Sequence, residues 1–198
     1  MEKRNKNQVG NTKEKILTAA TKLICESGYS NTTLEEIAKH AGTGKSTIFY
    51  HFKNKEEILS AVMEQSVLEI NKTIRTIADS DLTPEQKLKD ALNSHLHYLI
   101  TYIDSVTIFL REFRHLPPEN KERYVKGRKL YEGFFEKIVG ELQEEGRFKG
   151  LNVKIVTFGV LGMCNWLIVW HKEGGQGHLG PQEIAEVFYR MLTDGKEV

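Results

Sequence analysis

Hydroxyl, ammonium and imidazole side chains gather in one short segment near the start of the sequence. In chain order these residues are Thr43, Lys45, Ser46, Thr47, Tyr50 and His51. Such groups hydrogen-bond to phosphate oxygens and to the edges of bases, so the set has the chemistry of nucleic-acid recognition. The apolar residues Ile48, Phe49 and Phe52 are interleaved with them, and we expect these three to lock the segment onto a core.

Two short helices joined by a glycine-containing turn are predicted to carry these residues. Thr33 begins the first helix, and Glu36 follows it at the spacing of a capping box. This helix stops at Ala41–Gly42, and the second runs from Ser46 to His51. In a helix-turn-helix of this kind the second helix enters the major groove of DNA. Thr33, and Lys55 at the next helix start, are placed to offer a backbone N–H and a side chain to a phosphate.

Apolar residues recur at helical spacing through the rest of the chain, and no window alternates with the period of a strand. The four prolines lie between the predicted helices or at their ends. Asn54 is expected to cap the fourth helix. The sequence therefore predicts an all-α protein of about nine helices. Apart from the two short helices, they span residues 13–26, 55–71, 84–103, 106–116, 119–145, 151–170 and 181–192.

The charge of the chain is unevenly distributed. The formal net charge is only +1, but residues 1–60 hold ten basic against seven acidic side chains, and the remainder holds eighteen against twenty. A basic excess at the N-terminal end permits a nucleic-acid partner there, and dimerisation would double the phosphate contacts. No apolar run reaches the roughly 20 residues of a membrane span, and the first residues are polar and lack a secretory signal. Cytoplasmic localisation is therefore expected, with Cys25 and Cys164 reduced.

The segment AGTGKSTIFYHFKNKEEIL, residues 41–59, resembles the helix-turn-helix signature of the TetR family of bacterial regulators, usually written around AGVSKGTLYYHFKSKEEL. The resemblance implies that three N-terminal helices bind DNA, while a variable helical body binds a small ligand and dimerises. The predicted organisation is a flexible basic arm at 1–11, a DNA-binding domain at 12–54 and a ligand-binding and dimerisation domain at 55–198. Gly44 stands where the pattern usually has a capping Ser, and Ser46 where it has Gly, so the cap is weaker and the base preference cannot be transferred.

The C-terminal body carries one paired set of cations. Arg111 and Arg114 share a helix face because they are three residues apart. Together they either bind an anionic group or form ion pairs with Glu112 and Glu119, and the sequence leaves both interpretations open.

Aromatic and polar residues stand out in the apolar parts of the body. Tyr98 and Tyr102 either line a ligand cavity or fill the core. Asn165 lies among apolar neighbours, and its burial would require a hydrogen-bonding partner from a ligand, a second subunit or the backbone. Trp166 and Trp170, four residues apart, form an aromatic ledge that serves dimer packing or a ligand.

Three blocks of the body also resemble a TetR subgroup that senses coenzyme A thioesters in fatty-acid or steroid degradation. They read LREFRHLPPENKERY, GMCNWLIVWHKEGG and PQEIAEVF, between residues 109 and 188. The resemblance implies an acyl-CoA effector, with an apolar tunnel for the acyl chain and cations near its mouth for the phosphates. Arg111 and Arg114 would bind the phosphates, and Asn165, Trp166 and Trp170 would line the tunnel for the acyl chain.

These patterns together predict a homodimeric transcriptional repressor that a small ligand, an acyl-CoA, releases from a palindromic operator. Isologous packing of the long helices at 119–145 and 152–172, with the last helix, would form the dimer. No cofactor, metal or membrane partner is expected. One alternative is a multidrug sensor that controls an efflux pump, which would need buried carboxylates for cations. Another is a structural DNA-binding protein without a ligand.

An enzyme acting on CoA esters is a further alternative that the sequence disfavours. Cys164 and His171 would lie two turns apart on one helix, too far to act as nucleophile and base. The run Gly44-Lys45-Ser46 imitates the end of a phosphate-binding loop, but position 39 is lysine rather than glycine and no strand precedes it. We therefore expect no catalytic activity.

Overall fold

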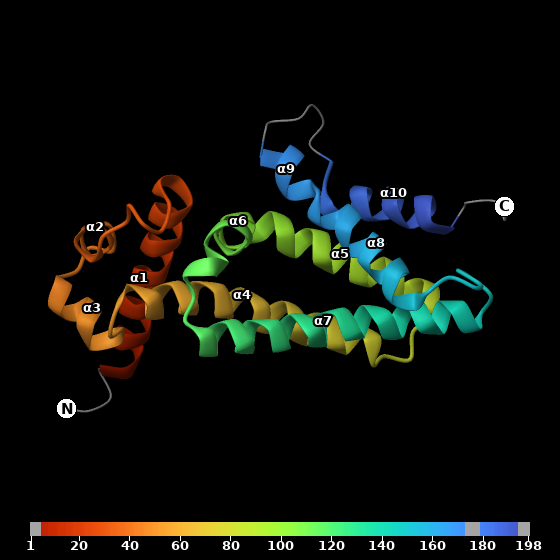
Figure 1. The fold of residues 1–198 in the computed structure, drawn as a ribbon, viewed down its shortest axis with the longest axis horizontal. Coiled ribbons are helices and arrows are strands. Elements are labelled where there is room, and N and C mark those ends of the chain that lie inside the picture. Colours follow the sequence, from red (N-terminus) through yellow and green to blue (C-terminus); the bar gives the residue numbers. More distant parts are fainter. Residues whose placement is uncertain (1–4, 173–178, 194–198) are drawn as a thin grey trace. The chain divides into compact units, whose positions relative to one another are not determined.

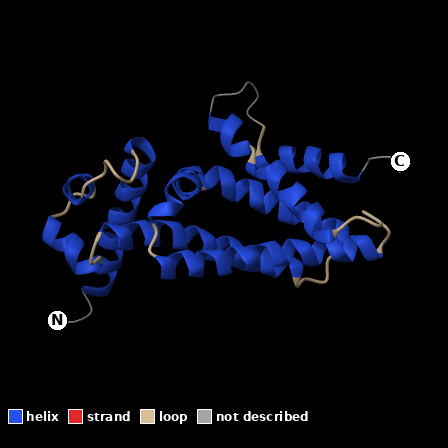
Figure 2. Ribbon diagram, viewed as in Figure 1, coloured by secondary structure: helices blue, strands red, loops and turns tan. Residues whose placement is uncertain are grey.

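The computed structural model of the chain describes residues 5–172 and 179–193. Within these ranges every regular element is a helix, which confirms the all-α prediction (Figure 1, Figure 2). The α-helices are, in order, α1 (Asn5–Ser27), α2 (Leu34–His40), α3 (Lys45–His51), α4 (Lys55–Ala78), α5 (Pro84–Thr101), α6 (Ile103–Glu112), α7 (Pro118–Glu144), α8 (Val153–Asn165), α9 (Leu167–Lys172) and α10 (Pro181–Thr193). A short 3-10 turn, η1 (Phe113–His115), follows α6. None of the described helices is both long and apolar enough to cross a bilayer.

The chain divides into two compact units. Of the described residues, the first unit comprises 5–66 and 104–124, and the second comprises 67–103, 125–172 and 179–193. The start of α4 belongs with the helix-turn-helix because Ile58, Leu59 and Met63 are buried in the core of that unit. Most of α6, with η1, also belongs to the first unit, although the sequence assigns it to the ligand-binding body.

The core of the first unit is an aliphatic cluster drawn from several helices. Ile16, Ala20 and Ile24 recur every four residues along α1 and are almost fully buried. The residues that join them from α2, α3, α4 and α6 include Ile37, Ile48, Ile58 and Ile108. Each large aliphatic side chain buried in this way contributes roughly 1.5–3 kcal/mol, and together they fix α2 and α3 on α1.

The first helix is longer than the sequence predicts. α1 begins at Asn5, whereas the expected helix starts at Lys13 after a flexible arm at 1–11. Extending a helix that is already nucleated adds one hydrogen bond per residue, so polar residues before the buried stripe can join it. Residues 1–4 of the predicted arm lie outside the described residues. At its other end, α1 gives way to Gly28, whose φ of +82° favours glycine and ends the helix.

The second unit is built around α5. The buried face of this helix carries Leu88, Leu92, Leu96 and Leu99 at helical spacing. α5 packs against α8, α9 and α10. Ring contacts join it also to α7, whose Phe135 is fully buried. α5 is therefore the central helix of the second unit, in contact with α7, α8, α9 and α10.

The helix predicted over 151–170 is two helices in the structure. α8 ends at Asn165 and α9 begins at Leu167, with Trp166 between them still in the right-handed helical conformation. The Val169 N–H bonds to the Trp166 carbonyl at 3.0 Å, a three-residue spacing that tightens the chain. Two glycines, poor helix formers, precede the interruption and weaken the helix there.

Candidate functional site

The start of α2 is closed by the predicted capping box. The Thr33 hydroxyl accepts from the Glu36 N–H at 3.2 Å, and the Thr33 N–H donates to the Glu36 carboxylate at 2.9 Å. The Thr33 hydroxyl also donates to that carboxylate, and these bonds lower the pKa of Glu36. Both donors of Thr33 are therefore used inside the box. A phosphate at this helix start would meet the N–H groups of Leu34 and Glu35, which have no partner within the helix.

α3 presents a polar face to solvent and only Ile48 to the core. Ile48 is fully buried and Phe52, just after the helix, is 3 % exposed, as the sequence predicts. The prediction that Phe49 points inward is wrong: its side chain is half exposed, because neighbouring residues on a helix are about 100° apart. Among the predicted DNA contacts, Lys45, Ser46 and Tyr50 are exposed, and Thr43, Thr47 and His51 are partly buried.

Lys45 has an acidic partner on α2. Its ammonium forms an ion pair with Glu35, and this bond lowers the pKa of the Glu35 carboxyl. The ammonium also lies 5.9 Å from the centroid of the Phe49 ring. Both members of the ion pair are exposed, and exposed pairs are weak, so a phosphate can replace the carboxylate.

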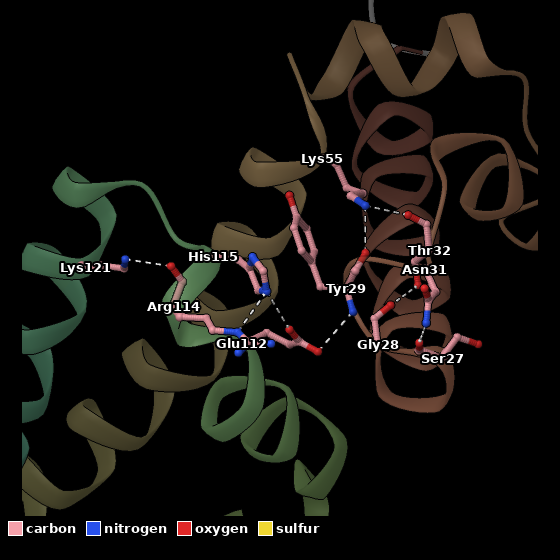
Figure 3. Close-up of polar contacts among 10 residues, drawn as sticks. All are labelled: Ser27, Gly28, Tyr29, Asn31, Thr32, Lys55, Glu112, Arg114, His115 and Lys121. Atoms are coloured by element: carbon pink, nitrogen blue, oxygen red, sulfur yellow. Dashed lines mark hydrogen bonds and ion pairs between the residues drawn. The ribbon is translucent and has the colours of Figure 1, made fainter.

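Lys55, at the start of α4, turns its ammonium toward the loop between α1 and α2 (Figure 3). It donates to the carbonyls of Tyr29 and Thr32, each at 2.8 Å, and lies 4.2 Å from the centroid of the Tyr29 ring. A phosphate contact by this side chain would require these bonds to break, so a phosphate at this end of α4 would meet backbone N–H groups instead. Asn54 caps the helix as predicted by accepting the Glu57 N–H at 2.8 Å.

A buried carboxylate joins the same loop to α6 (Figure 3). Glu112 is 8 % exposed; one of its oxygens accepts the Tyr29 N–H at 3.2 Å, and the other lies 3.5 Å from His115 Nε2. The rings of Tyr29 and His115 are 5.1 Å apart. Burial, followed by contact with Glu56, raises the pKa of Tyr29. The sequence does not single out Tyr29 and offers Glu112 only as an ion-pair partner for the arginines, yet together with Lys55 they connect α1, α4 and α6.

Arg111 and Arg114 lie in the first unit, and both are exposed. The Nε of Arg114 donates to His115 Nε2 at 3.2 Å (Figure 3). Glu112 lies beside His115 rather than beside either arginine, and no ion pair with Glu119 is found within the part of the chain that the structure describes. The guanidinium groups are therefore accessible to an anion.

Tyr98 and Tyr102 lie together beside a cavity in the second unit. Their ring centroids are 5.2 Å apart, and the cavity has a volume of about 310 Å³. Its remaining wall comes from α4 and α5 and is formed by Ile70, Thr73, Asn93, Ser94, His97 and Thr101. The wall thus offers hydroxyl, amide and imidazole groups, and no carboxylate belongs to it.

The interior of the second unit contains polar groups that the sequence does not single out. His95 belongs to the apolar stripe of α5, is 5 % exposed, and has its Nδ1 2.5 Å from the Tyr131 hydroxyl of α7. Burial lowers the pKa of His95 to about 4 and raises that of Tyr131. His95 Nε2 and Thr157 Oγ1 are both buried without a hydrogen-bond partner. A histidine within an apolar stripe is the one sequence signal that could have revealed this cluster.

Asn165, the last residue of α8, and Trp166, which follows it, both have exposed side chains in the single chain. The Asn165 side chain approaches His95 closely enough to favour the protonated imidazole, without completing a hydrogen bond to Nε2. Trp166 is 64 % exposed. The side chain of Trp170 lies outside what the structure describes, so its ledge with Trp166 stays a prediction.

Large apolar side chains are exposed along α8, α9 and α10. They are Ile155, Phe158, Trp166, Val169, Val187 and Met191, each exposed by 42–67 %. Gly159 and Gly162 lie on α8 among them, and a β-carbon added at either would meet only open space. An exposed apolar surface with a strip that lacks side chains suits close approach of another helix.

Two family models match the chain. Residues 16–62 match the model described as bacterial regulatory proteins, tetR family. Residues 81–196, more than half of the chain, match the model described as tetracyclin repressor-like, C-terminal domain. The two matches thus cover both the helix-turn-helix and most of the second unit.

Individual relatives are similar over most of the chain. Over 95 % of its length it is 24 % identical to the HTH-type transcriptional repressor KstR2 of Mycobacterium tuberculosis, of which it covers 94 %. It is 26 % identical to the fatty acid metabolism regulator protein of Bacillus subtilis, over 74 % of this chain and 76 % of that one. Among solved structures it resembles AibR in complex with isovaleryl coenzyme A and operator DNA, with a TM-score of 0.79, 26 % identity, and coverage of 92 % of this chain and 98 % of that one.

Proposed function

Because the chain belongs to the TetR family of bacterial regulatory proteins, we propose that it acts as a homodimer which represses transcription from a palindromic operator and leaves that operator when an acyl-CoA binds. The observation that carries the DNA-binding part is the outer face of α3, where Ser46 and Tyr50 are exposed while Ile48 anchors the helix. A short helix held on one side by a core and polar on the other is the part of a helix-turn-helix that enters the major groove.

The exposed apolar surface of α8, α9 and α10 supports the dimer. Apolar patches of this kind on a helical body are stabilised by a second copy, and an isologous interface gives a two-fold axis. A two-fold protein matches a palindromic operator, because each recognition helix then meets one half-site.

The acyl-CoA part rests on the relatives and on the chemistry of the second unit. AibR has been solved with isovaleryl coenzyme A, and another relative is a fatty acid metabolism regulator. The cavity beside Tyr98 and Tyr102 and the buried pair His95–Tyr131 offer neutral hydrogen-bonding groups and aromatic surface. These features suit an uncharged acyl group and give no counter-charge to a cationic drug, which disfavours the multidrug-sensor alternative.

A ligand releases DNA only by favouring a state in which the recognition helices bind the operator less well. Within the first unit, the loop before α2 provides a route for such a change. The Tyr29 N–H is held by Glu112 of α6, and the Tyr29 carbonyl is held by Lys55 of α4. A shift of either helix would pull on this loop and, through α2, on α3.

The buried Cys164 does not support the alternative of an enzyme that acts on CoA esters. Burial raises the pKa of Cys164 to about 12, and the thiolate rather than the thiol is the nucleophile. The His171 side chain, the base that the sequence analysis weighed for it, lies outside the described residues.

Operator release by CoA thioesters tests this proposal. A fluorescent operator, selected by the protein from a random-sequence pool, is titrated with thioesters from butyryl- to stearoyl-CoA, with free CoA, with the matching fatty acids and with cationic dyes. We expect the thioesters alone to lower the anisotropy. Release by the dyes alone would support the multidrug sensor, and no response to any thioester would refute the acyl-CoA assignment.

A further inference from the structure

A buried histidine in the second unit lacks one of its two hydrogen bonds. The Nδ1 of His95 contacts the Tyr131 hydroxyl, whereas its Nε2 is buried and has no partner. An unsatisfied polar atom inside a protein is costly, so such an atom usually meets a water, an ion or a ligand group. Nε2 is therefore a candidate contact for a bound molecule.

The contact with Tyr131 indicates which ring nitrogen of His95 carries the proton. If the Tyr131 hydroxyl donates to Nδ1, only the Nε2–H is left without a partner. If Nδ1 donates instead, the described structure leaves both the hydroxyl proton and the Nε2 lone pair without partners. The first arrangement leaves fewer buried groups unsatisfied and is favoured. Burial also keeps the imidazole neutral, since the pKa of His95 is lowered to about 4. Nε2 is thus an uncharged hydrogen-bond donor.

The surroundings of His95 are aromatic and uncharged. The Phe135 ring lies edge-on, 6.1 Å from the imidazole. The buried Cys164 thiol stays protonated, because burial raises its pKa to about 12. The Asn165 side chain of α8 lies close enough to His95 to favour the protonated imidazole. A donor in such a setting binds an uncharged acceptor, because an anion would lose its water without gaining a counter-charge.

One side chain of the cavity wall lies near the His95–Tyr131 pair. Tyr98 and Tyr102 line the cavity of about 310 Å³, and Tyr98 lies close enough to Tyr131 to affect its titration. Tyr98 also follows His95 by three residues on α5, so the two share a helix face. Tyr98 therefore belongs both to the cavity wall and to the neighbourhood of the His95–Tyr131 pair.

We propose that His95 Nε2 donates a hydrogen bond to the carbonyl oxygen of the ligand's acyl group, with the Asn165 amide as a second polar contact. The proposal rests on the acyl-CoA function, since every CoA thioester carries this acceptor next to sulfur. It assigns a carbonyl-recognition site to α5, α7 and the end of α8. Tyr131 acts as a positioning residue, because its hydroxyl holds the imidazole in the donating tautomer.

A thioester and the matching thioether distinguish this site from general apolar binding. The acyl-CoA that releases the operator best is compared, by calorimetry on the full chain without DNA, with an S-alkyl-CoA of equal length, which lacks only the carbonyl oxygen. Wild-type protein should bind the thioester about tenfold or more tightly than the thioether. His95→Leu should bind both ligands equally, and His95→Gln, which retains a donor, should keep part of the preference. Lys87→Met is the matched control, because it removes another buried contact between α5 and α7, to Glu141, and should leave the preference unchanged.

The outcomes separate this proposal from the function on which it rests. Equal binding of thioester and thioether by the wild type would overturn the carbonyl site while leaving the acyl-CoA function intact. A wild-type preference that persists in His95→Leu would overturn it as well. If neither ligand binds the wild type, the acyl-CoA function fails, and the carbonyl site fails with it. The wild-type comparison needs no variant, so misfolding of His95→Leu does not remove the test.

Discussion

His95→Gln isolates the cost of keeping a buried imidazole neutral. Burial lowers the pKa of His95 from 6.5 to about 4 in the folded protein, and the unfolded chain retains the ordinary value. Above pH 6.5 both states are neutral, so the residue adds no pH dependence. As the pH falls below 6.5, the unfolded chain binds a proton that the folded chain does not, and the folded state loses stability until the pH reaches about 4.

The size of this loss follows from the two pKa values. Each unit of pH within the window changes the free energy of unfolding by about 1.4 kcal/mol, and between pH 7 and pH 5 the loss is about 2 kcal/mol. The glutamine variant has no titrating group at this position and should lack that part of the loss. Urea unfolding at fixed protomer concentration, followed by circular dichroism at pH 7, 6 and 5, measures the difference. Parallel pH curves for the two proteins would refute the claim that the folded state keeps His95 neutral.

Three further predictions concern the surfaces for DNA and for the second subunit. Glu35→Gln should tighten operator binding about three- to tenfold, measured by anisotropy, because it frees the Lys45 ammonium for phosphate. Tyr50→Ala should abolish operator binding in a gel-shift assay without loss of the dimer, because the side chain is 75 % exposed and supports no core. Phe158→Asp should yield monomers in analytical ultracentrifugation, because it places a carboxylate within the exposed apolar surface of α8.

Each of these predictions has a control or a contrary result. Glu144→Gln is the control for Glu35→Gln, because it makes the same charge change at the end of α7, and it should leave operator affinity unchanged. Weaker operator binding by Glu35→Gln would mean that the Glu35 carboxylate itself contacts DNA. Unchanged operator affinity of Tyr50→Ala would remove that side chain from the recognition surface. A Phe158→Asp protein that stays dimeric would show that the subunits meet elsewhere.

Short-range contacts are the part of the site that the sequence predicts well. The Thr33–Glu36 capping box and the Asn54 cap join groups three residues apart, so spacing alone reveals them. The inward direction of Ile48 also follows from the period of a helix. The exposure of Phe49 follows from the same period once Ile48 is known to face the core, but its apolar type alone suggested the opposite.

Long-range contacts are the part that the sequence does not predict. Tyr29 and Glu112 are 83 residues apart, and Lys55 and Tyr29 are 26 residues apart, so no spacing rule links them. The sequence therefore assigns the Lys55 side chain to a phosphate, whereas its ammonium binds two carbonyls of a loop. His95 likewise fits the apolar stripe of α5, and only its pairing with Tyr131 in space exposes the unsatisfied nitrogen.

Reciprocal measurement of two affinities tests ligand-controlled DNA binding most directly. Operator affinity is measured by anisotropy with and without saturating acyl-CoA, and acyl-CoA affinity is measured by calorimetry with and without saturating operator. Thermodynamic linkage requires the two ratios to be equal, and we predict a ratio of about 10 or more in each, within the usual range of allosteric coupling. A ratio of one, with the acyl-CoA measurably bound, would contradict the account.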